Sequence, residues 1–426
     1  MSDLISPTEL DGEQPDESLP KWFLEAAAGL AIFVAAVVVY LPAVNGEMLW
    51  HDRNYISDTP TSETTELILN GRRGLRDIWL TGKAMEYFPL TNSLFWLEWR
   101  LWSKEDGGFS REGYHLVSIL FHALAAVVIW RVLIRLGVPW AWLGGMLSAV
   151  HPVTVPSVAW LSELKNCLSI FLYSLWILAW LRYDDRPTPR GYVLALALFA
   201  MGMLAKASGV ALPATIVILA WWRRGRVTWD DLRRTVPFFA FALAIGLIAI
   251  WAERAHSLGQ SNSRPEGLAS RIAAIGWIVW FYYLKDIVPT GLAMVYPRWA
   301  ISPTDILSWA PLAGLIALGV AAWRFRASWG RPILALLSYT LVALVPVLGL
   351  AAMSYHDHSL VSDHFQYLVL PAVMGLVAGT LGWSARRWGG GAKLAGYALA
   401  GACVLACLAA TWHRAGVFST SESFWE

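Results

Sequence analysis

Charged residues are scarce in this chain. Only 15% of its 426 residues are Asp, Glu, Lys or Arg, whereas 57% are hydrophobic and the mean hydropathy is +0.48. A soluble domain carries about 25% charged residues, so this composition predicts a polytopic membrane protein. The sequence also lacks a clustered basic surface outside its apolar runs, so we expect no nucleic-acid partner.

Cysteines are few, and a cleavable signal peptide is not evident. The three cysteines cannot build a disulfide framework, and Cys403 and Cys407, four residues apart, are expected to be packing residues. Residues 1–20 are acidic and proline-containing and have no basic segment before the first apolar run. We therefore expect a disordered cytoplasmic tail over 1–20 and a retained membrane anchor after it.

Long apolar runs are abundant. A spanning helix needs about 20 apolar residues, and many of the 26 tryptophans lie at the ends of such runs, as in an interfacial aromatic belt. The pattern predicts an all-α membrane domain over 21–426 with about eleven transmembrane helices. The expected spans are 22–44, 114–131, 140–159, 167–182, 191–206, 208–222, 236–254, 304–323, 332–352, 364–383 and 395–413.

Arginine-rich segments lie between alternate spans and set the predicted orientation. Because cytoplasmic loops are enriched in Lys and Arg, all five basic groups are assigned to the cytoplasm, with the amino terminus inside and the carboxyl terminus outside. This parity leaves no span for the apolar stretch 272–288, which we expect to lie in or re-enter the outer interface. The segment 191–222 then requires two short helices hinged at Lys206-Ala207-Ser208-Gly209.

This topology predicts three main loops on the outer face, at 45–113, 255–303 and 354–363. The first loop contains two amphipathic stretches, Glu63 to Trp79 and Tyr87 to Trp102. Both are too polar and short to span, so we expect helices that lie on the membrane surface.

The first span ends in Trp50-His51-Asp52-Arg53-Asn54. Ionisable groups at a membrane boundary are costly and are often functional. Asp52 is the best candidate for a general base that deprotonates an attacking hydroxyl, and its alternative role is an ordinary helix-terminal acid beside Arg53. His51 is the neighbouring candidate.

Three cations are predicted on the same face: Lys165, Lys206 and Arg298. Such cations stabilise the charge that develops on a phosphate in transfer reactions, although each could instead extend to lipid head groups. His115 could contact a phosphate or sugar, whereas the deeper His122 is expected to have a hydrogen-bonded packing role.

His356-Asp357-His358 is the most metal-like cluster in the sequence. Imidazoles and carboxylates are suitable ligands, but the spacing matches no closed zinc motif. A polar loop that closes over a substrate is the preferred interpretation, and neither a divalent metal nor another cofactor is expected.

Several segments in a fixed order carry a family resemblance. They are Trp50 through Trp102, Gly113-Tyr114-His115-Leu116, His151-Pro152-Val153, Ser157-Val158-Ala159-Trp160, Ser162-Glu163-Leu164-Lys165-Asn166, Tyr296-Pro297 and Asp363-His364-Phe365-Gln366-Tyr367. In this order they resemble bacterial relatives of the transmembrane-and-TPR protein O-mannosyltransferases, which are similar to GT-C integral membrane glycosyltransferases.

The resemblance implies a metal-independent transferase with a periplasmic site, a polyprenyl-phosphate sugar donor and a carboxylate base in the first external loop. It also implies a TPR domain after the last helix. The sequence ends at Phe424-Trp425-Glu426, near where such repeats would begin, so we expect either repeats beyond Glu426 or a membrane domain that stands alone. The residues expected to shape the substrate groove are Tyr87, Trp96, Glu98, Trp99, His151, Glu163, Asn166, Tyr296, Asp363, His364 and Tyr367.

The chain departs from the family pattern at three positions. His51 replaces the first of two adjacent acids, Pro156 stands where another acid is common, and His364 replaces the arginine of an Asp-Arg-Tyr motif. Each change removes a charge that could serve catalysis or phosphate binding. Such variants could mark a different donor or lost activity.

These observations lead to a main hypothesis and a rival. The main one is a bacterial inner-membrane glycosyltransferase that transfers a sugar, with mannose as one candidate, to a protein or glycan hydroxyl on the periplasmic face. The rival is a catalytically silent GT-C-like scaffold that associates with other membrane proteins. A transporter is less favoured, because the helices show no inverted repeat. Membrane lipids are expected partners in either case.

Overall fold

The computed structural model describes residues 20–104, 108–256, 266–350, 353–388 and 390–425. The predicted tail 1–20 therefore lies almost entirely outside the described residues. Helices dominate the described chain, whose one isolated β-bridge joins Ser103 to Phe109, so the predicted all-α fold is confirmed. The helices are α1 (Lys21–Val39), α2 (Glu63–Leu69), α3 (Gly71–Leu80), α4 (Pro89–Trp102), α5 (Arg111–Arg135), α6 (Ala141–Val150), α7 (Val155–Ala159), α8 (Leu164–Asp185), α9 (Pro189–Ala205), α10 (Ala214–Arg224), α11 (Trp229–His256), α12 (Leu268–Ile287), α13 (Ala310–Arg324), α14 (Gly330–Leu344), α15 (Leu370–Trp388), α16 (Gly390–Val417) and α17 (Ser421–Trp425).

Seven helical segments in the described residues are long and apolar enough to cross a membrane. They are Lys21–Ala43, Arg111–Arg135, Leu161–Asp185, Trp229–Ala252, Ile306–Arg324, Gly330–Val347 and Gly390–Val417. Each corresponds to one of the eleven expected spans. The other four expected spans fall on α6 with α7, α9, α10 and α15, which do not meet the same length and composition criteria.

The expected span 140–159 is wrong as a single helix. Helix α6 ends at Val150, a short 3-10 turn covers Pro152–Thr154, and α7 follows. The physical reason is Pro152, which has no backbone N–H to continue the α6 ladder and restricts the conformation of His151 before it. This break brings His151 and Trp160 to the same end of the molecule as the polar segments.

The predicted hinge near Lys206 is present. Helix α9 ends at Ala205, a 3-10 turn covers Ala207–Gly209, and α10 begins only at Ala214. The side chain of Tyr173 fills the space beside Gly209, where an added Cβ would lie 2.1 Å from the tyrosine hydroxyl oxygen. The small residue therefore allows the backbone to turn tightly against α8.

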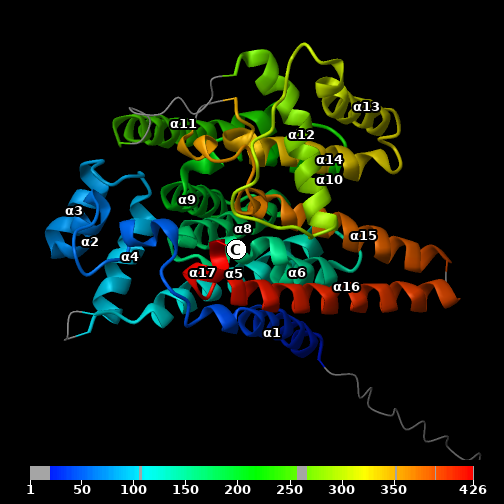
Figure 1. The fold of residues 1–426 in the computed structure, drawn as a ribbon. Helices are drawn as coiled ribbons and strands as arrows, with labels where there is room; N and C mark the ends of the chain where they lie inside the picture. The colour runs from blue at the N-terminus through cyan, green and yellow to red at the C-terminus, as the bar shows by residue number, and fades with distance from the viewer. Residues whose placement is uncertain (1–19, 105–107, 257–265, 351–352, 389, 426) are drawn as a thin grey trace, which may run out of the picture.

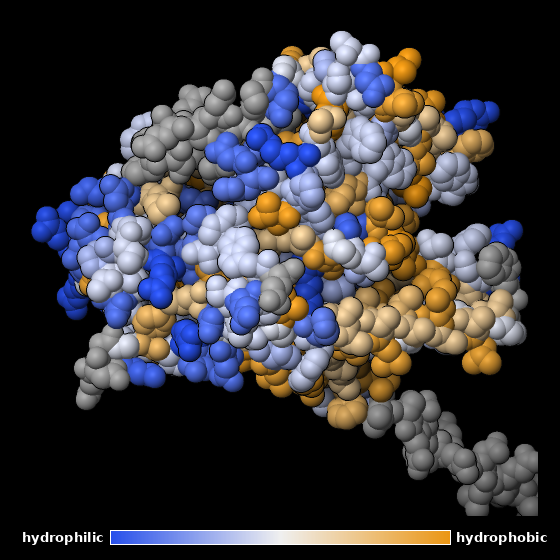
Figure 2. Space-filling model, viewed as in Figure 1, coloured by the Kyte–Doolittle hydropathy of each residue, from blue (hydrophilic) through white to orange (hydrophobic). Residues whose placement is uncertain are grey.

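The first predicted outer loop forms three helices, α2, α3 and α4, which gather at one end of the molecule (Figure 1). Figure 2 shows hydrophilic residues over this end and hydrophobic residues over α15 and α16. The predicted amphipathic stretch Glu63–Trp79 is two helices rather than one, because Gly71, the first residue of α3, has φ +58°. We call the α2–α4 end the outer end, following the sequence prediction.

Helix α12 falls on the stretch that parity left without a span, and it is not among the seven candidate spans. Its side chains contact the predicted outer ends of two spans, 304–323 and 332–352: Trp277 donates to the Ser308 carbonyl and Arg271 to that of Leu350. Asp286, near its other end, accepts a hydrogen bond from His151 through its carbonyl oxygen at 3.1 Å. The predicted interfacial position agrees with these contacts and stays a prediction.

Helix α8 lies at the centre of the fold, packed against α5 and α9. Its Trp176 is buried against Phe199 of α9, with ring centroids 5.0 Å apart. Helices α1 and α16 lie side by side along one edge (Figure 1). Cys403 and Cys407 of α16 pack against the main core as expected. This core fixes α8 and α9, whose outer ends carry the functional candidates.

Candidate functional site

Five polar residues from three segments meet at the outer end, and we call them the polar centre. They are Glu86, Glu163, Lys165, Asn166 and Lys206. Glu163, Lys165 and Asn166 stand at the start of α8, Lys206 follows the end of α9, and Glu86 precedes α4. The α9 hinge matters here, because it turns the Lys206 side chain toward α8.

Lys165 is held between two carboxylates. Its Nζ lies 2.8 Å from Glu86 Oε2 and 3.5 Å from Glu163 Oε1. The ammonium also lies 5.5 Å from the ring centre of Tyr55, whose hydroxyl donates to Glu86. The residue is 9% exposed, so its charge is compensated by neighbours rather than by bulk water.

Lys206 shares Glu163 with Lys165. Its Nζ lies 3.8 Å from Glu163 Oε2 and donates to the side-chain oxygen of Asn166. Asn166 in turn donates to Glu163 Oε2 at 2.6 Å. Glu163 thus holds two ammonium groups within one small region, which is an arrangement suited to binding an anion.

Asp52 is completely buried. It lies in the 3-10 turn Trp50–Asn54, where its Oδ2 accepts from the Leu49 backbone N–H at 2.8 Å. Its Oδ1 accepts from the Ser162 backbone N–H at 2.8 Å. Burial raises the pKa of Asp52 to about 7, although both backbone hydrogen bonds act against the shift. The carboxyl group therefore fastens this turn to the Leu161–Glu163 turn that begins the polar centre.

Trp50 is the centre of an aromatic cluster. Its ring stacks with the rings of His51 and Trp160, whose centroids lie 4.8 Å and 5.7 Å from its own. The backbone of Trp50 has φ +35°, a strained conformation for a residue with a side chain. His51 is exposed at the end of this stack, and the ring of Trp425 in α17 meets an edge of Trp50 at 5.7 Å.

A second buried network holds the segment 362–367 in place. Asp363 accepts from the hydroxyl of Tyr296 and from the guanidinium of Arg414, both at 2.7 Å. The neighbouring His364 contacts Ser362 Oγ through Nδ1 at 2.7 Å, and its ring lies 6.0 Å from that of Trp160. Tyr296, Asp363 and His364 are therefore brought close to the aromatic cluster.

Other predicted site residues have structural contacts in the described chain. Trp96 donates to the Gly71 carbonyl, Tyr87 to that of Trp79, and Trp99 packs on Phe109, so these rings tie the outer helices together. Glu98 is 1% exposed and has no hydrogen-bond partner among the described residues.

Three of the predicted histidines, His115, His122 and His151, are buried. His122 contacts the Tyr367 hydroxyl at 2.5 Å and the Ala149 carbonyl at 2.8 Å, which confirms its packing role. His151 caps the turn after α6 by accepting from Val153 N–H at 3.3 Å. His115 is enclosed beside Gly46, whose added Cβ would lie 3.1 Å from the imidazole Nε2.

Arg298 and the metal-like cluster belong to other segments than those that form the polar centre. Arg298 lies 3.9 Å from Glu266 in an ion pair. His356 is buried, whereas Asp357 and His358 are exposed. No group of three His, Cys, Asp or Glu side chains within the described ranges could hold a metal ion.

Glu86 is the functional candidate that the sequence analysis missed. It lies 79 residues from Lys165, so no local pattern connects the two. One feature of the sequence does point to it: Glu86 stands directly before Tyr87-Phe88-Pro89, where the predicted amphipathic stretch Tyr87 to Trp102 begins. An acid there could have been paired with a predicted outer-face cation.

A largely apolar groove of about 870 Å³ lies between α5, α8, α10, α14 and α15, and Tyr173 is the lining residue that contacts the polar centre. Tyr173 and Leu368 line the end near the polar centre, and the Tyr173 hydroxyl donates to the Lys206 carbonyl at 3.0 Å. Trp329 and Trp383 line the other end. The groove is therefore largely apolar, and the two lysines and two glutamates of the polar centre lie beyond its Tyr173 end.

Residues 96–252 match the family model described as dolichyl-phosphate-mannose-protein mannosyltransferase. This match confirms the predicted family resemblance. It runs from within α4 to within α11, and therefore includes the start of α8 and Lys206.

Two curated proteins are similar to part of this chain. Protein O-mannosyl-transferase Tmtc2 of Drosophila melanogaster is 30% identical over 192 residues, which cover 41% of this chain and 19% of that protein. Protein O-mannosyl-transferase F38B6.6 of Caenorhabditis elegans is 28% identical over 145 residues, which cover 30% of this chain and 19% of that protein. The matched regions thus span about a fifth of each relative's length.

Two solved structures are also similar. ArnT from Cupriavidus metallidurans, bound to undecaprenyl phosphate, has 15% identity and a TM-score of 0.47, covering 90% of this chain and 63% of ArnT. The arabinofuranosyltransferase AftD from Mycobacteria has 17% identity and a TM-score of 0.43, covering 94% of this chain and 27% of AftD. Likeness at this level assigns no role to any residue.

Proposed function

We propose that this chain is a membrane glycosyltransferase that uses a lipid-linked sugar at its outer end. The observation that carries the proposal is the meeting of two lysines, Lys165 and Lys206, beyond one end of the apolar groove. A polyprenyl-phosphate sugar has the matching chemistry, since its tail is apolar and its phosphate is anionic. The family match to mannosyltransferases supports the same class of reaction.

The proposed step is an inverting transfer. The acceptor hydroxyl loses its proton to a carboxylate, and its oxygen forms a bond to the anomeric carbon. The bond from that carbon to the phosphate oxygen breaks, and the electron pair leaves with the lipid phosphate. Lys165 and Lys206 would stabilise the negative charge that grows on this leaving group. No metal ion or other cofactor takes part in the proposed step.

Asp52 remains a proposal as the base. Its pKa of about 7 suits proton transfer near neutral pH. However, each of its oxygens accepts a backbone hydrogen bond and the side chain is fully buried. In this role the 3-10 turn that carries His51 and Asp52 would have to move before an acceptor could reach the carboxylate.

Further parts of the proposal concern the setting. We propose mannose as the first sugar to test, a protein or glycan hydroxyl as acceptor, and a bacterial inner membrane with the amino terminus cytoplasmic and the carboxyl terminus periplasmic. The basic residues between alternate helices support this orientation. Arg298, His115 and the predicted groove side chains remain proposed substrate contacts.

Transfer of radiolabelled sugar in proteoliposomes tests the proposal. The purified protein is supplied with polyprenyl-phosphate monosaccharides, beginning with mannose, and with peptide or glycan acceptors. Lys206→Met is expected to lower transfer by about 100-fold, the scale of one lost transition-state contact. Lys83→Met, at an exposed lysine of the first outer loop, is the matched control and should transfer normally.

A catalytically silent scaffold is the second candidate. The burial of Asp52 favours it, because the predicted base is not exposed to an acceptor. This candidate predicts stable copurification with other membrane proteins and no transfer from any lipid-linked sugar. Equal transfer by the wild type and the Lys206→Met variant would contradict the proposed role of the polar centre.

A further inference from the structure

Glu86 is the most accessible acid at the polar centre. Its side chain is 38% exposed, compared with 5% for Glu163, whereas Asp52 is fully buried. A general base must come within about 2.6–3.2 Å of the hydroxyl that it deprotonates. Among these three carboxylates, Glu86 meets that requirement with the least movement of the backbone.

The backbone around Glu86 is held firmly. Its carbonyl oxygen accepts from the Phe88 N–H at 2.9 Å and from the Asn92 side chain at 3.3 Å. Thr91 of α4 donates to the carbonyl of Ala205 at 2.8 Å, directly before Lys206. The start of α4 is therefore tied to the end of α9, and Glu86 reaches the polar centre from a different element than Lys206 does.

Lys165 links this carboxylate to the proposed phosphate position. Its ammonium is closer to Glu86, at 2.8 Å, than to Glu163, at 3.5 Å. A phosphate placed between Lys165 and Lys206 would compete with Glu86 for the same ammonium. Glu163 would keep contact with both lysines during that exchange, because it lies within 3.8 Å of each.

We infer that Glu86 takes the proton of the acceptor hydroxyl, and that Lys165 holds it in an ion pair until the lipid phosphate takes over the ammonium. This inference rests on the proposed glycosyl transfer. The proton moves to a Glu86 carboxylate oxygen as the acceptor oxygen bonds to the anomeric carbon. The bond between that carbon and the phosphate oxygen breaks, so charge and atoms balance without an oxidant or reductant.

The ion pair with Lys165 controls how strongly Glu86 binds a proton. Burial raises the pKa of Glu86, but the charge of Lys165 and the hydrogen bonds from Lys165 and Tyr55 outweigh it, so the pKa stays below its usual value. Paired Glu86 is thus a weak base, and it becomes a stronger one when the ammonium turns to the phosphate. The charged and titratable groups that face Glu86 are Lys165, Glu163, Tyr55, His51, Lys206 and His364.

In this arrangement Asp52 is a positioning residue. It fastens the Trp50–Asn54 turn to the Leu161–Glu163 turn through the Leu49 and Ser162 backbone groups. His51 is left exposed beside the site.

Three variants test the inference: Glu86→Gln, Glu86→Asp and the matched control Glu66→Gln, which changes an exposed acid of α2. Each full-length protein is assayed for transfer from the polyprenyl-phosphate sugar that the wild type uses. Its affinity for undecaprenyl phosphate alone is measured separately, together with its thermal unfolding midpoint in detergent.

The expected results separate catalysis from binding. Glu86→Gln should lose about 10²-fold or more of the transfer rate, the usual contribution of a general base, and Glu86→Asp should retain part of it. Glu86→Gln should also bind undecaprenyl phosphate about 2- to 5-fold more tightly, since a partly exposed competitor for Lys165 is removed. Glu66→Gln should match the wild type in all three measurements.

Two results would overturn the inference. Wild-type transfer rates in a well-folded Glu86→Gln variant would exclude Glu86 as the base, and unchanged or weaker binding of undecaprenyl phosphate would exclude the exchange at Lys165. Absence of transfer by the wild type from every donor is a different result, because it contradicts the proposed function, whereas the binding measurement still decides the exchange.

Discussion

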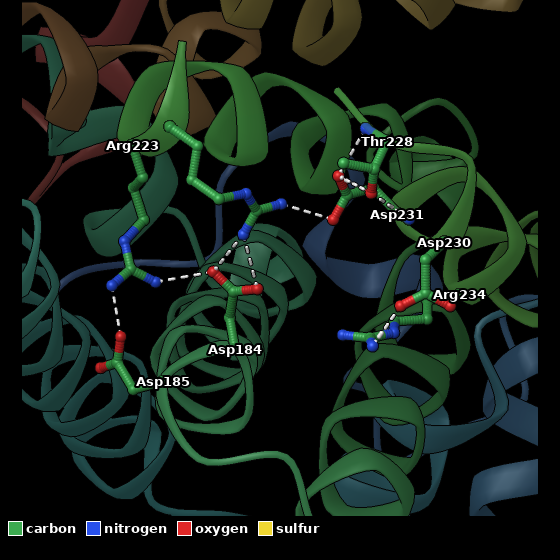
Figure 3. Close-up of polar contacts among 8 residues, drawn as sticks. Asp184, Asp185, Arg223, Thr228, Asp230, Asp231 and Arg234 are labelled. Atoms are coloured by element: carbon green, nitrogen blue, oxygen red, sulfur yellow. Dashed lines mark hydrogen bonds and ion pairs between the residues drawn. The ribbon is translucent and has the colours of Figure 1, made fainter. Parts of the chain in front are cut away.

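Two clusters of ion pairs lie at opposite ends of the helices, and they differ in their contact distances and in the exposure of their side chains. The inner cluster, at the ends of α8 and α10 and the start of α11, pairs arginines with aspartates (Figure 3). Arg223 lies 2.7 Å from Asp184, and Arg224 contacts both Asp184 and Asp231. In the outer polar centre, two lysines share Glu163 at 3.5 and 3.8 Å.

Exposure explains the contrast. The Arg223 and Arg224 side chains are 27% and 33% exposed, so water can replace a lost partner there. Lys165 and Lys206 are 11% and 16% exposed, and an unpaired charge in that position would be costly. The inner cluster stabilises helix ends, whereas the outer one keeps cations in place with longer contacts that a ligand could replace.

Removal of Glu163 should have the largest effect. Glu163→Leu leaves two mostly buried ammonium groups without their shared carboxylate, and breaking a buried pair costs about 3–5 kcal/mol. We expect a large drop in the thermal unfolding midpoint in detergent and loss of transfer. Near-normal stability would show that the outer centre is as well hydrated as the inner cluster.

The pH dependence of stability should differ between wild type and Asp52→Asn. Because folding raises the pKa of Asp52 from 3.8 to about 7, the folded state binds the proton more tightly. The contribution of the Asp52 carboxyl group to the free energy of unfolding is fully present below the pKa of the unfolded state. It is lost as the pH rises from about 4 to 7. We expect the stability of the wild type to fall by roughly 2–3 kcal/mol more than that of Asp52→Asn between pH 5 and pH 8, measured by unfolding at both values. Parallel curves would contradict the raised pKa.

The apolar groove lies along α8 between the two charged regions and provides a third test. Gly379 of α15 lines it, and an added Cβ there meets Val138 only at 3.4 Å, so Gly379→Leu should fill space without severe clash. We expect about 10-fold weaker binding of undecaprenyl phosphate, equivalent to about 1.4 kcal/mol. Gly319→Leu on α13, where nothing lies within 4 Å, is the control and should bind normally.

The smallest effect is expected in the inner cluster. Arg223→Ala removes contacts to Asp184 and Asp185, and exposed ion pairs contribute about 0.2–1 kcal/mol each. Stability should fall by no more than about 1–2 kcal/mol, and transfer should remain unchanged. A loss of transfer comparable with that of Lys206→Met would break the distinction between the two regions.

Local patterns in the sequence predicted many elements correctly. The apolar runs identified the helices, and the cluster at Lys206-Ala207-Ser208-Gly209 identified the hinge before α10. The continuous apolar character of 140–159 concealed the break at Pro152, because hydropathy averages over a window and does not register a missing N–H. Gly71 likewise divided a stretch that amphipathicity presented as one helix.

The site was predicted less completely, since proximity depends on long-range packing. Glu163, Lys165, Asn166 and Lys206 were all expected on one face, and they do meet. Arg298 instead pairs with Glu266, and Glu86 was not considered. The exposure of Asp52 could not be predicted either, because nothing near it in the sequence indicates that Ser162 will cover it.

The sequence by itself determined the class of molecule: apolar runs require helices in a membrane, and the basic segments between alternate spans predict their orientation. Only the tertiary structure decided which charges meet and which are accessible. The contact between Glu86 and Lys165 joins residues 79 positions apart, and the bond from Thr91 to the Ala205 carbonyl ties the start of α4 to the same end of the fold. Burial of Asp52 and exposure of Glu86 follow from that packing, and packing is a property of the whole fold.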